Sequence, residues 1–317
     1  MDELQRFHFD GLPVHGRLVR LDASWREMLA RRGAQPHARP VLELLGQMVA
    51  AGVLLRSNIK FDGSLLLQLH GDGAVKLAVA EVRDGASFRA TATVSGTVAD
   101  DAPLHSLLDL HGAGRCSITL DPGRRHAGQQ PYQGVVPLRD ERGQRLPSLA
   151  KMLEHYMQQS EQLETRLLLA ANAEVAAGLM IQRLPSDGAT RVAGEVQGPA
   201  FGRNEDFNRI AHLAATLTRD ELLTLDGDTL LHRLFWQERV QRESLQPPRF
   251  ACRCARERVR DMLRALGPDE VHGIVAERGE VEVGCEFCGQ QYRFDAVDVG
   301  GLFTPPRDQP ATPGALQ

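Results

Sequence analysis

Apolar and polar positions in the first two hundred residues follow two different spacings. In 38–55 and again in 147–163, apolar residues recur every three or four positions, which is typical of an amphipathic helix. The first helix is expected to bury one face, made of Val41, Leu44, Leu45, Met48 and Val49. The second is expected to bury Leu149, Met152, Leu153 and Tyr156.

Strand-like stretches lie between and after these helices. Residues 64–82 predict two strands joined at "GDGA", which carries the Asp-Gly turn signal. "CSITLDPG" and "YQGVVPL" predict a second antiparallel pair, and "TRLLLAAN" and "AAGLMIQRLP" predict strands that are buried on both faces or nearly so. Residues 1–198 therefore predict an N-terminal mixed domain of the α+β class with antiparallel sheets.

The pattern changes over residues 199–250, which carry short, heavily charged helical stretches. "NEDFNRIAHLAATL" and "TRDELLTLDGDTLLHRLFWQERVQRESLQPP" are helical in pattern. Thr218 and Glu221 have the spacing of a capping box, and Asp228 is a plausible N-cap for the next helix. Helices this short are marginal in isolation, so they need an apolar surface supplied by another part of the chain. We predict a metastable helical linker over 199–250.

The remainder predicts a small domain and a tail. "ARERVRDMLRAL" places Val259, Met262, Leu263 and Leu266 at helical spacing, and "DEVHGIVAERG" predicts a second short helix. "EVEV" and "QQYRF" predict strands on either side of "CEFCG". A unit of about fifty residues cannot build a sufficient hydrophobic core unaided. We predict a small domain over 251–303 and a disordered, proline-rich tail over 304–317.

Length and composition limit the class of protein. A chain of 317 residues exceeds the usual size of one hydrophobic core, and its net charge of −4 gives no basic bias toward nucleic acid. The start, "MDELQRFHFDGLP", has no apolar leader, and no window of eighteen consecutive apolar residues predicts a membrane span. We therefore expect a cytoplasmic protein without a membrane partner, in a compartment that keeps thiols reduced.

Four of the five cysteines fall between Cys252 and Cys288, spaced as C-x-C and C-x-x-C. In a reducing compartment such clusters indicate metal binding or redox chemistry rather than structural disulfides. Four thiolates on one tetrahedral zinc ion would add on the order of 10 kcal/mol of metal-coupled folding to the small domain. We predict one zinc ion per chain, and the predicted ligands are Cys252, Cys254, Cys285 and Cys288.

Other interpretations of the cysteines and histidines carry less weight. A thioredoxin-like C-x-x-C normally precedes a helix, whereas strands flank this one. His272 lies between the cysteine pairs, but four thiolates already complete a tetrahedral shell. Cys116 sits in a strand-like run and is expected to be a small core residue. No Ser-His-Asp or paired-carboxylate constellation is present, so we predict no catalytic residues and no enzymatic activity.

Charge and sulfur chemistry bear on what the metal does. Residues 251–300 hold seven arginines and no lysine against ten acidic residues, a net charge of −3 before the thiolates are counted. A nucleic-acid ribbon is expected to be basic, so we expect no nucleic-acid partner. Zinc-bound thiolates remain open to attack by peroxide or hypochlorous acid, and closely spaced pairs can close as local disulfides. The domain is therefore predicted to be an oxidant-sensitive fold.

These motifs carry a resemblance to a known family. "CRCARERV" and "GEVEVGCEFCGQQYRFDAVDV" come after "KFDGSLLLQLHGDGAVKLAVAEV", "YQGVVPL", "YMQQSEQLETRLLLA" and "AAGLMIQRLP", in this order. Over nearly its whole length the chain resembles the heat-shock protein 33 family, redox-regulated holdase chaperones of bacteria. The family's four zinc ligands fall on the four clustered cysteines, whereas Cys116 and the proline-rich tail match no family motif.

The resemblance implies a mixed α+β domain, a helical linker and a small C-terminal zinc-binding domain. It implies an inactive, reduced, zinc-bound state and an oxidised state that loses zinc, unfolds locally and binds unfolding client proteins without ATP. On this basis we expect the disulfides Cys252–Cys254 and Cys285–Cys288, with the second forming first, and a homodimer when oxidised. Linker release is expected to expose Phe207, Leu213, Leu222, Leu230 and Phe235.

The residues alone are also compatible with two other functions. The first is a zinc-ribbon adaptor that binds a protein or nucleic-acid partner constitutively. The second is a thiol-disulfide oxidoreductase that uses Cys285 and Cys288.

Overall fold

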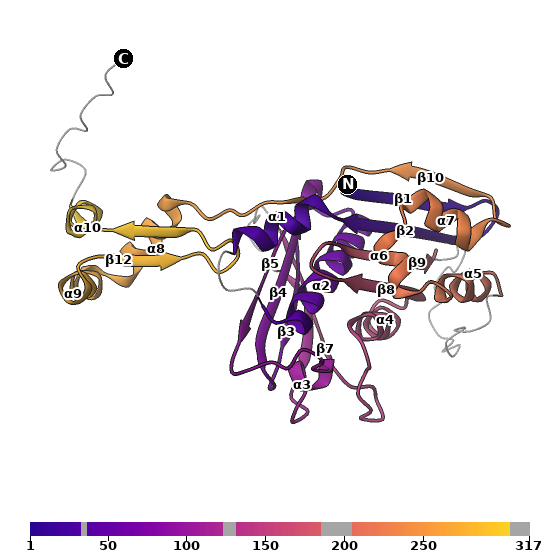
Figure 1. Cartoon of the computed structure of the whole chain (residues 1–317), viewed down its shortest axis with the longest axis horizontal. Helices are drawn as coiled ribbons and strands as arrows, with labels where there is room; N and C mark the ends of the chain where they lie inside the picture. The colour runs from indigo at the N-terminus through magenta and orange to yellow at the C-terminus, as the bar shows by residue number, and fades with distance from the viewer. Residues whose placement is uncertain (33–36, 123–130, 185–204, 305–317) are drawn as a thin grey trace, which may run out of the picture. The chain divides into compact units, whose positions relative to one another are not determined.

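The computed structural model describes residues 1–32, 37–122, 131–184 and 205–304 (Figure 1). The chain forms two compact units, one over Met1–Ala30 and Gln35–Ala251, the other over Arg31–Ala34 and Cys252–Gln317. Part of the predicted linker, 199–204, and residues 305–317 of the predicted tail lie outside the described residues.

Two sheets form the framework of the first unit (Figure 1). The five-stranded sheet has the order β10-β1-β2-β9-β8, and all its neighbours are antiparallel. Its strands are β1 (Glu3–Phe9), β2 (Val14–Leu21), β8 (Thr165–Ala171), β9 (Ala176–Arg183) and β10 (Val240–Ser244).

The six-stranded sheet has the order β11-β5-β4-β3-β6-β7, and only the short β11 runs parallel to its neighbour. Its strands are β3 (Gly63–His70), β4 (Val75–Arg83), β5 (Ser87–Val94), β6 (Arg115–Pro122), β7 (Tyr132–Pro137) and β11 (Arg249–Phe250). The predicted hairpin over 64–82 is confirmed as β3 and β4, and the second predicted pairing is confirmed as β6 and β7.

Helix α2 (Arg39–Asn58) packs against both sheets. The five residues of its predicted apolar face are buried, and so is most of the rest of the helix, because a sheet lies on each side of it. A Cβ atom on Gly46 would lie 2.4 Å from the Ala171 side chain, and one on Gly52 would lie 2.9 Å from Val82. These two glycines therefore let α2 approach the sheets closely.

Helix α2 is also the one helix in the described part of the chain with the length and hydropathy of a membrane span. The unit buries 72% of its most apolar window, as in the core helix of a globular protein. On this ground α2 gives only weak support for a membrane span.

The other helices of this part are short. They are α1 (Ala23–Arg31), the 3₁₀ turn η1 (Asp84–Ala86), α3 (Leu104–Leu108) and α4 (Leu149–Gln159). The helix predicted over 147–163 is confirmed as α4 with its predicted residues buried, and Ser148 caps it by accepting the Lys151 amide at 3.3 Å. Strand β9 is buried on both faces as predicted, whereas the edge strand β8 is only partly so.

Three helices cover the face of the five-stranded sheet away from α2: α5 (Glu205–Ala215), α6 (Arg219–Thr224) and α7 (Gly227–Phe235) (Figure 1). Their apolar residues join Phe7, Phe9 and other sheet residues in one cluster of twenty buried side chains. The predicted capping box of Thr218 and Glu221 is present.

Two details of the linker prediction are wrong. The N-cap of α7 is Asp226, whose Oδ1 accepts the Thr229 amide at 2.9 Å, whereas Asp228 lies inside the first turn and pairs with Arg242. The helical pattern also ends at Phe235, and 240–244 form strand β10 along β1. An edge strand is held by main-chain bonds, so its side chains need no period of two and leave little sequence signal.

The second unit is small. Its elements are α8 (Arg256–Leu266), α9 (Pro268–Arg278), β12 (Val281–Gly284), β13 (Gln291–Phe294) and α10 (Ala296–Phe303). The predicted helices and the predicted strand pair are present, and α10 was not predicted. Of the predicted apolar stripe on α8, Leu263 is buried, but Met262 and Leu266 are 44% and 52% exposed. The core contains six buried side chains: Leu263, Val271, Val281, Phe294, Val299 and Leu302.

Candidate metal centre

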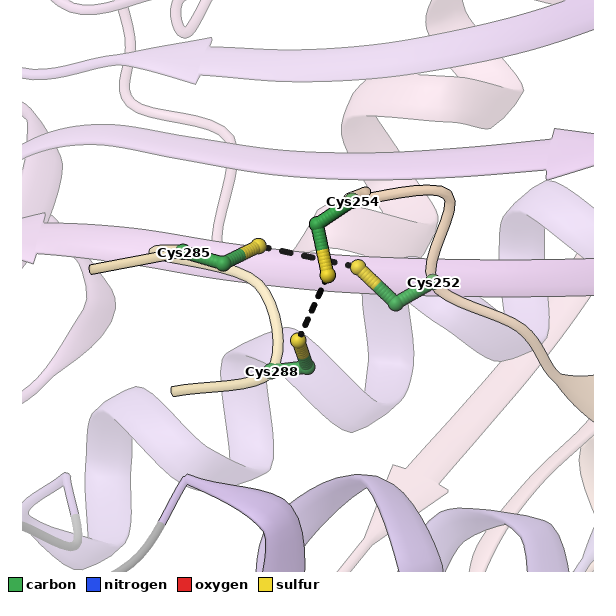
Figure 2. A group of neighbouring side chains, drawn as sticks. All are labelled: Cys252, Cys254, Cys285 and Cys288. Atoms are coloured by element: carbon green, nitrogen blue, oxygen red, sulfur yellow. Dashed lines mark hydrogen bonds between the residues drawn. The ribbon is translucent and has the colours of Figure 1, made fainter. Parts of the chain in front are cut away.

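The four clustered cysteines lie on two short segments of the second unit (Figure 2). Cys252 and Cys254 belong to the extended segment before α8, and Cys285 and Cys288 to the turn between β12 and β13. The turn is tight, because the Gly289 amide donates to the Cys285 carbonyl at 2.7 Å and the Cys285 amide donates to the Gln290 carbonyl at 2.9 Å. Gly289 has a φ of 71°, a left-handed conformation that favours glycine.

All four Sγ atoms lie within 4.8 Å of one another, and none belongs to a disulfide. Two sulfur contacts cross between the pairs: Cys252 to Cys285 at 3.6 Å and Cys254 to Cys288 at 3.3 Å (Figure 2). A tetrahedral four-thiolate zinc site with Zn–S bonds of about 2.3 Å separates its sulfurs by about 3.8 Å. The donor set and its spacing therefore fit a zinc ion.

Backbone amides are directed at these sulfurs. The Cys254 amide hydrogen-bonds to the sulfur of Cys252, and the Phe287 and Cys288 amides hydrogen-bond to that of Cys285. The Gln290 amide does the same for Cys288. Hydrogen bonds to sulfur favour the thiolate form, which is the form that binds metal.

The thiols do not ionise equally. Burial raises the pKa of Cys252, but hydrogen bonds from the Cys254 amide and from the neighbouring thiols outweigh it and lower the pKa to about 7. Burial raises the pKa of Cys285 and of Cys288. The pKa of Cys252 is thus lowered while those of Cys285 and Cys288 are raised, and residue Cys252 is less buried than residue Cys288.

Tyr292 is a neighbour of the cysteine cluster that the sequence did not reveal. Its hydroxyl is hydrogen-bonded to the Cys254 sulfur, and this bond raises the pKa of Tyr292. A hydroxyl donor to a thiolate orients that ligand and reduces its charge. The only available signal was the position of Tyr292 on β13, two residues from the turn that holds the second cysteine pair.

The remaining candidates lie elsewhere. Cys116 is a buried core residue as predicted, and burial raises the pKa of its thiol to about 12. His272 packs against Phe303, with ring centroids 5.7 Å apart. Within the described residues, the four cysteines are the one group of three or more metal-binding side chains brought together.

Comparisons with known proteins show the family and the fold of the chain. A family profile described as "Hsp33 protein" matches residues 2–295. The "33 kDa chaperonin" of Chromobacterium violaceum is 44% identical over 302 residues, covering 95% of this chain and 94% of that protein. The protein of the same name from Nitrosococcus oceani is 39% identical, covering 98% of this chain and 97% of that protein.

The crystal structure of the 33 kDa chaperonin (heat shock protein 33 homolog) of Thermotoga maritima has a similar fold, with a TM-score of 0.73. It covers 95% of this chain and 97% of its own, at 19% identity. The predicted resemblance and the predicted α+β class are both confirmed. The chain belongs to the Hsp33 family of chaperones.

Proposed function

We propose that the chain is a redox-regulated, ATP-independent holdase of the cytoplasm. The reduced form holds one zinc ion through Cys252, Cys254, Cys285 and Cys288 and is inactive. Oxidation forms disulfides, releases the zinc, unfolds the linker and lets the chain bind unfolding proteins before they aggregate. The observation that carries this proposal is the gathering of four thiols within 4.8 Å in a unit whose core contains six side chains.

The metal matters because the second unit has little other stability. Six buried apolar residues are a small core, and bound zinc would add on the order of 10 kcal/mol of metal-coupled folding. Removing the thiolates by oxidation therefore removes the main stabilising interaction of the unit. A redox change at four sulfurs becomes a change of fold.

Oxidation of two thiols to a disulfide releases two protons and two electrons. Hydrogen peroxide accepts both and leaves as two molecules of water. We expect the bridges Cys252–Cys254 and Cys285–Cys288, although close sulfur contacts also run between the pairs. Cross-pair bridges would keep the two segments joined and preserve the compact fold, whereas local bridges separate them.

The Cys285–Cys288 bridge is expected first, because a C-x-x-C ring is less strained than a C-x-C ring. Peptide mapping at short oxidation times tests the pairing. Mainly cross-pair bridges would contradict it, and Cys116→Ala controls for the fifth thiol.

Release of α5 to α7 would provide the binding surface. These helices cover apolar residues of the five-stranded sheet, and their own apolar residues, such as Leu222 and Leu230, face the same cluster. Exposure of both sides produces contiguous apolar surface, which binds unfolding chains without nucleotide. We further propose that the oxidised form is a homodimer.

A constitutive zinc-ribbon adaptor is the second candidate. One observation favours it: Met262 and Leu266 are exposed on α8, one helical turn apart, and form a small apolar patch available to a protein partner. Such an adaptor would lose its partner on oxidation, whereas a holdase would gain activity.

The test measures aggregation of a heat-unfolding reporter enzyme with the reduced zinc form and with the peroxide-treated form. Zinc release is followed in the same samples with a chromogenic chelator, and Cys116→Ala serves as the control that keeps all four ligands. We expect suppression of aggregation to appear only after oxidation, together with release of one zinc per chain. Full activity in the reduced form, or turnover of a dithiol substrate, would contradict the proposal.

A further inference from the structure

Strand β10 occupies the outer edge of the five-stranded sheet, beside β1. The pairing runs from Gln5 opposite Ser244 to Phe9 opposite Val240. At the two ends of the ladder, the Leu245 amide donates to the Leu4 carbonyl at 2.8 Å and the Asp10 amide donates to the Arg239 carbonyl at 2.9 Å. Antiparallel rungs alternate, so Arg6 and His8 direct their backbone groups at β10, while Gln5, Phe7 and Phe9 direct theirs at β2.

The side chains of β10 contribute little to this pairing. Four of its five residues are exposed, and only Val240 is partly buried. Glu243 pairs with Arg6, and Arg242 pairs with Asp228 at 2.6 Å, but all four of these side chains are more than 40% exposed. Exposed ion pairs contribute little, so the main-chain ladder holds the strand. Because main-chain groups form this ladder, strands of many different sequences could pair with β1 in the same way.

Strand β1, the neighbour of β10 in the sheet, carries two aromatic rings. Phe7 and Phe9 are buried against Phe235 of α7, with ring centroids 6.1 and 5.0 Å from it. Their cross-strand neighbours on β10 are Arg242 and Val240. If α7 and β10 leave together, β1 becomes a bare sheet edge with two exposed phenylalanines.

We propose that β10 is a displaceable cover strand whose place is taken by an extended segment of an unfolding client protein. The client segment adds an antiparallel strand to β1 through the backbone groups of Arg6 and His8, and its apolar side chains at alternate positions pack beside Phe7 and Phe9. This inference rests on the proposed function, because β10 lies within the linker that oxidation is expected to release.

The resident strand itself supports this choice of occupant. The edge of β1 is already paired with five residues of extended chain, VQRES, whose side chains are mostly polar and exposed. Unfolding proteins expose extended backbone with unpaired N–H and C=O groups, and a bare strand edge satisfies them without sequence selection. A holdase must accept clients of many sequences.

Two proline variants of one rung provide the test. His8 and Gln241 are opposite each other, and each directs its N–H across the same rung. His8→Pro and Gln241→Pro each remove one bond from the closed ladder, but only His8→Pro damages the edge that a client would use. After oxidation, we expect His8→Pro to bind a heat-unfolded reporter roughly tenfold more weakly, and Gln241→Pro to bind it as well as the unsubstituted chain. Equal behaviour of the two variants would overturn the inference.

A peptide experiment on the unsubstituted, oxidised protein covers the case in which a variant fails to fold. The probe is a synthetic peptide of residues 238–247, ERVQRESLQP. N-methylation of its Gln241 and Glu243 amides, which face β1, is expected to abolish competition with the reporter. N-methylation of Val240 and Arg242, which face away, is expected to leave competition unchanged. Equal competition by both forms, or by neither, would contradict strand addition.

Hydrogen exchange shows which chain fills the edge. With reporter bound, we expect the Arg6 and His8 amides to be protected and those of Gln241 and Glu243 to exchange. Protection of Arg6 and His8 that rises with protein concentration and needs no reporter would show that two β1 edges pair with each other, and would overturn the client assignment. If the oxidised protein never suppresses aggregation, the proposed function fails first, and that outcome is distinct from a failure of strand addition alone.

Discussion

The two units of the chain reach a stable fold in different ways. In the first unit, twenty buried side chains join the five-stranded sheet to α5, α6 and α7, and α2 is buried between two sheets. In the second unit, six buried side chains hold three helices and a hairpin, and part of the apolar stripe on α8 faces solvent. Burial suffices for the first unit. In the proposed function, zinc held by the four sulfurs stabilises the second unit, and this would make the unit sensitive to oxidants.

Within the first unit, the helices also differ in how many of their sides are packed. Helix α2 has a sheet on each side, whereas α5 to α7 cover one face of one sheet. A helix packed on one side can leave without dismantling what lies beneath it. The release proposed for α5 to α7 would therefore leave the core around α2 in place.

Metal removal is expected to produce the largest difference between the two units. Chelation, or Cys288→Ser, is expected to remove on the order of 10 kcal/mol of folding energy from the second unit and little from the β3–β4 region of the first. Hydrogen exchange at 256–303 and at 63–83 measures the two effects separately. Cys116→Ala is the control and is expected to keep one zinc per chain. Retained protection of 256–303 after chelation would mean that the small core suffices without metal.

Truncation of one aromatic side chain in the linker tests whether apolar burial holds α5 to α7 against the five-stranded sheet. Phe235 is buried against Phe7 and Phe9, while its neighbour Trp236 is 67% exposed. Phe235→Ala is expected to destabilise the closed linker by about 3–5 kcal/mol and to raise holdase activity without oxidant. Trp236→Ala is the matched control, for which we expect little change. The measurements are exchange over 205–235 and aggregation of the reporter, and equal effects of the two variants would refute the burial argument.

Loss of the capping box of α6 is expected to destabilise the same group of helices by a smaller amount. The Thr218 hydroxyl accepts the Glu221 amide at 3.3 Å, so Thr218→Ala is expected to cost about 1 kcal/mol of linker stability. Thr224 bonds the Asp220 carbonyl at the other end of the helix and is exposed, so Thr224→Ala is expected to be nearly neutral. Exchange rates of α6 amides in the reduced form compare the two. A larger effect from Thr224→Ala would contradict the role of the cap.

Low pH is expected to have the smallest effect on the stability of the linker. Hydrogen bonds from backbone amides lower the pKa of Glu221, which accepts from Thr218, and of Asp226, which accepts from Thr229. A carboxyl whose pKa is lower in the folded state stabilises that state at pH values above its unfolded pKa, about 4, and the contribution is lost as pH falls through the folded pKa. Linker protection is therefore expected to decline below about pH 4.

A double variant separates this effect from acid release of metal. Glu221→Gln with Asp226→Asn keeps the hydrogen-bonding shape but cannot titrate, so its linker protection is expected to depend less on pH. An identical pH profile for the two proteins would exclude these caps as the cause.

The local spacing of apolar and turn residues predicted those helices and strands that depend mainly on residues close together in the chain. Helix α2, helix α4 and the β3–β4 hairpin follow from spacing and turn residues that lie within a few positions of one another. The cysteine cluster was predictable for a different reason: few chemistries require thiols at C-x-C and C-x-x-C spacing. Strand β10 was missed because its partner β1 is more than two hundred residues away and its side chains carry no alternation.

By itself, the sequence determined helices α2 and α4, the β3–β4 hairpin, the cysteine cluster and the family, because spacing and ligand chemistry are properties of residues close together in the chain. The tertiary structure alone decided that Asp226 rather than Asp228 caps α7, that Tyr292 meets the Cys254 sulfur, and that β10 covers the edge of β1. Each of these depends on which distant groups meet in space. An amide, a hydroxyl or a strand edge selects its partner by position and geometry, and no local pattern records that position.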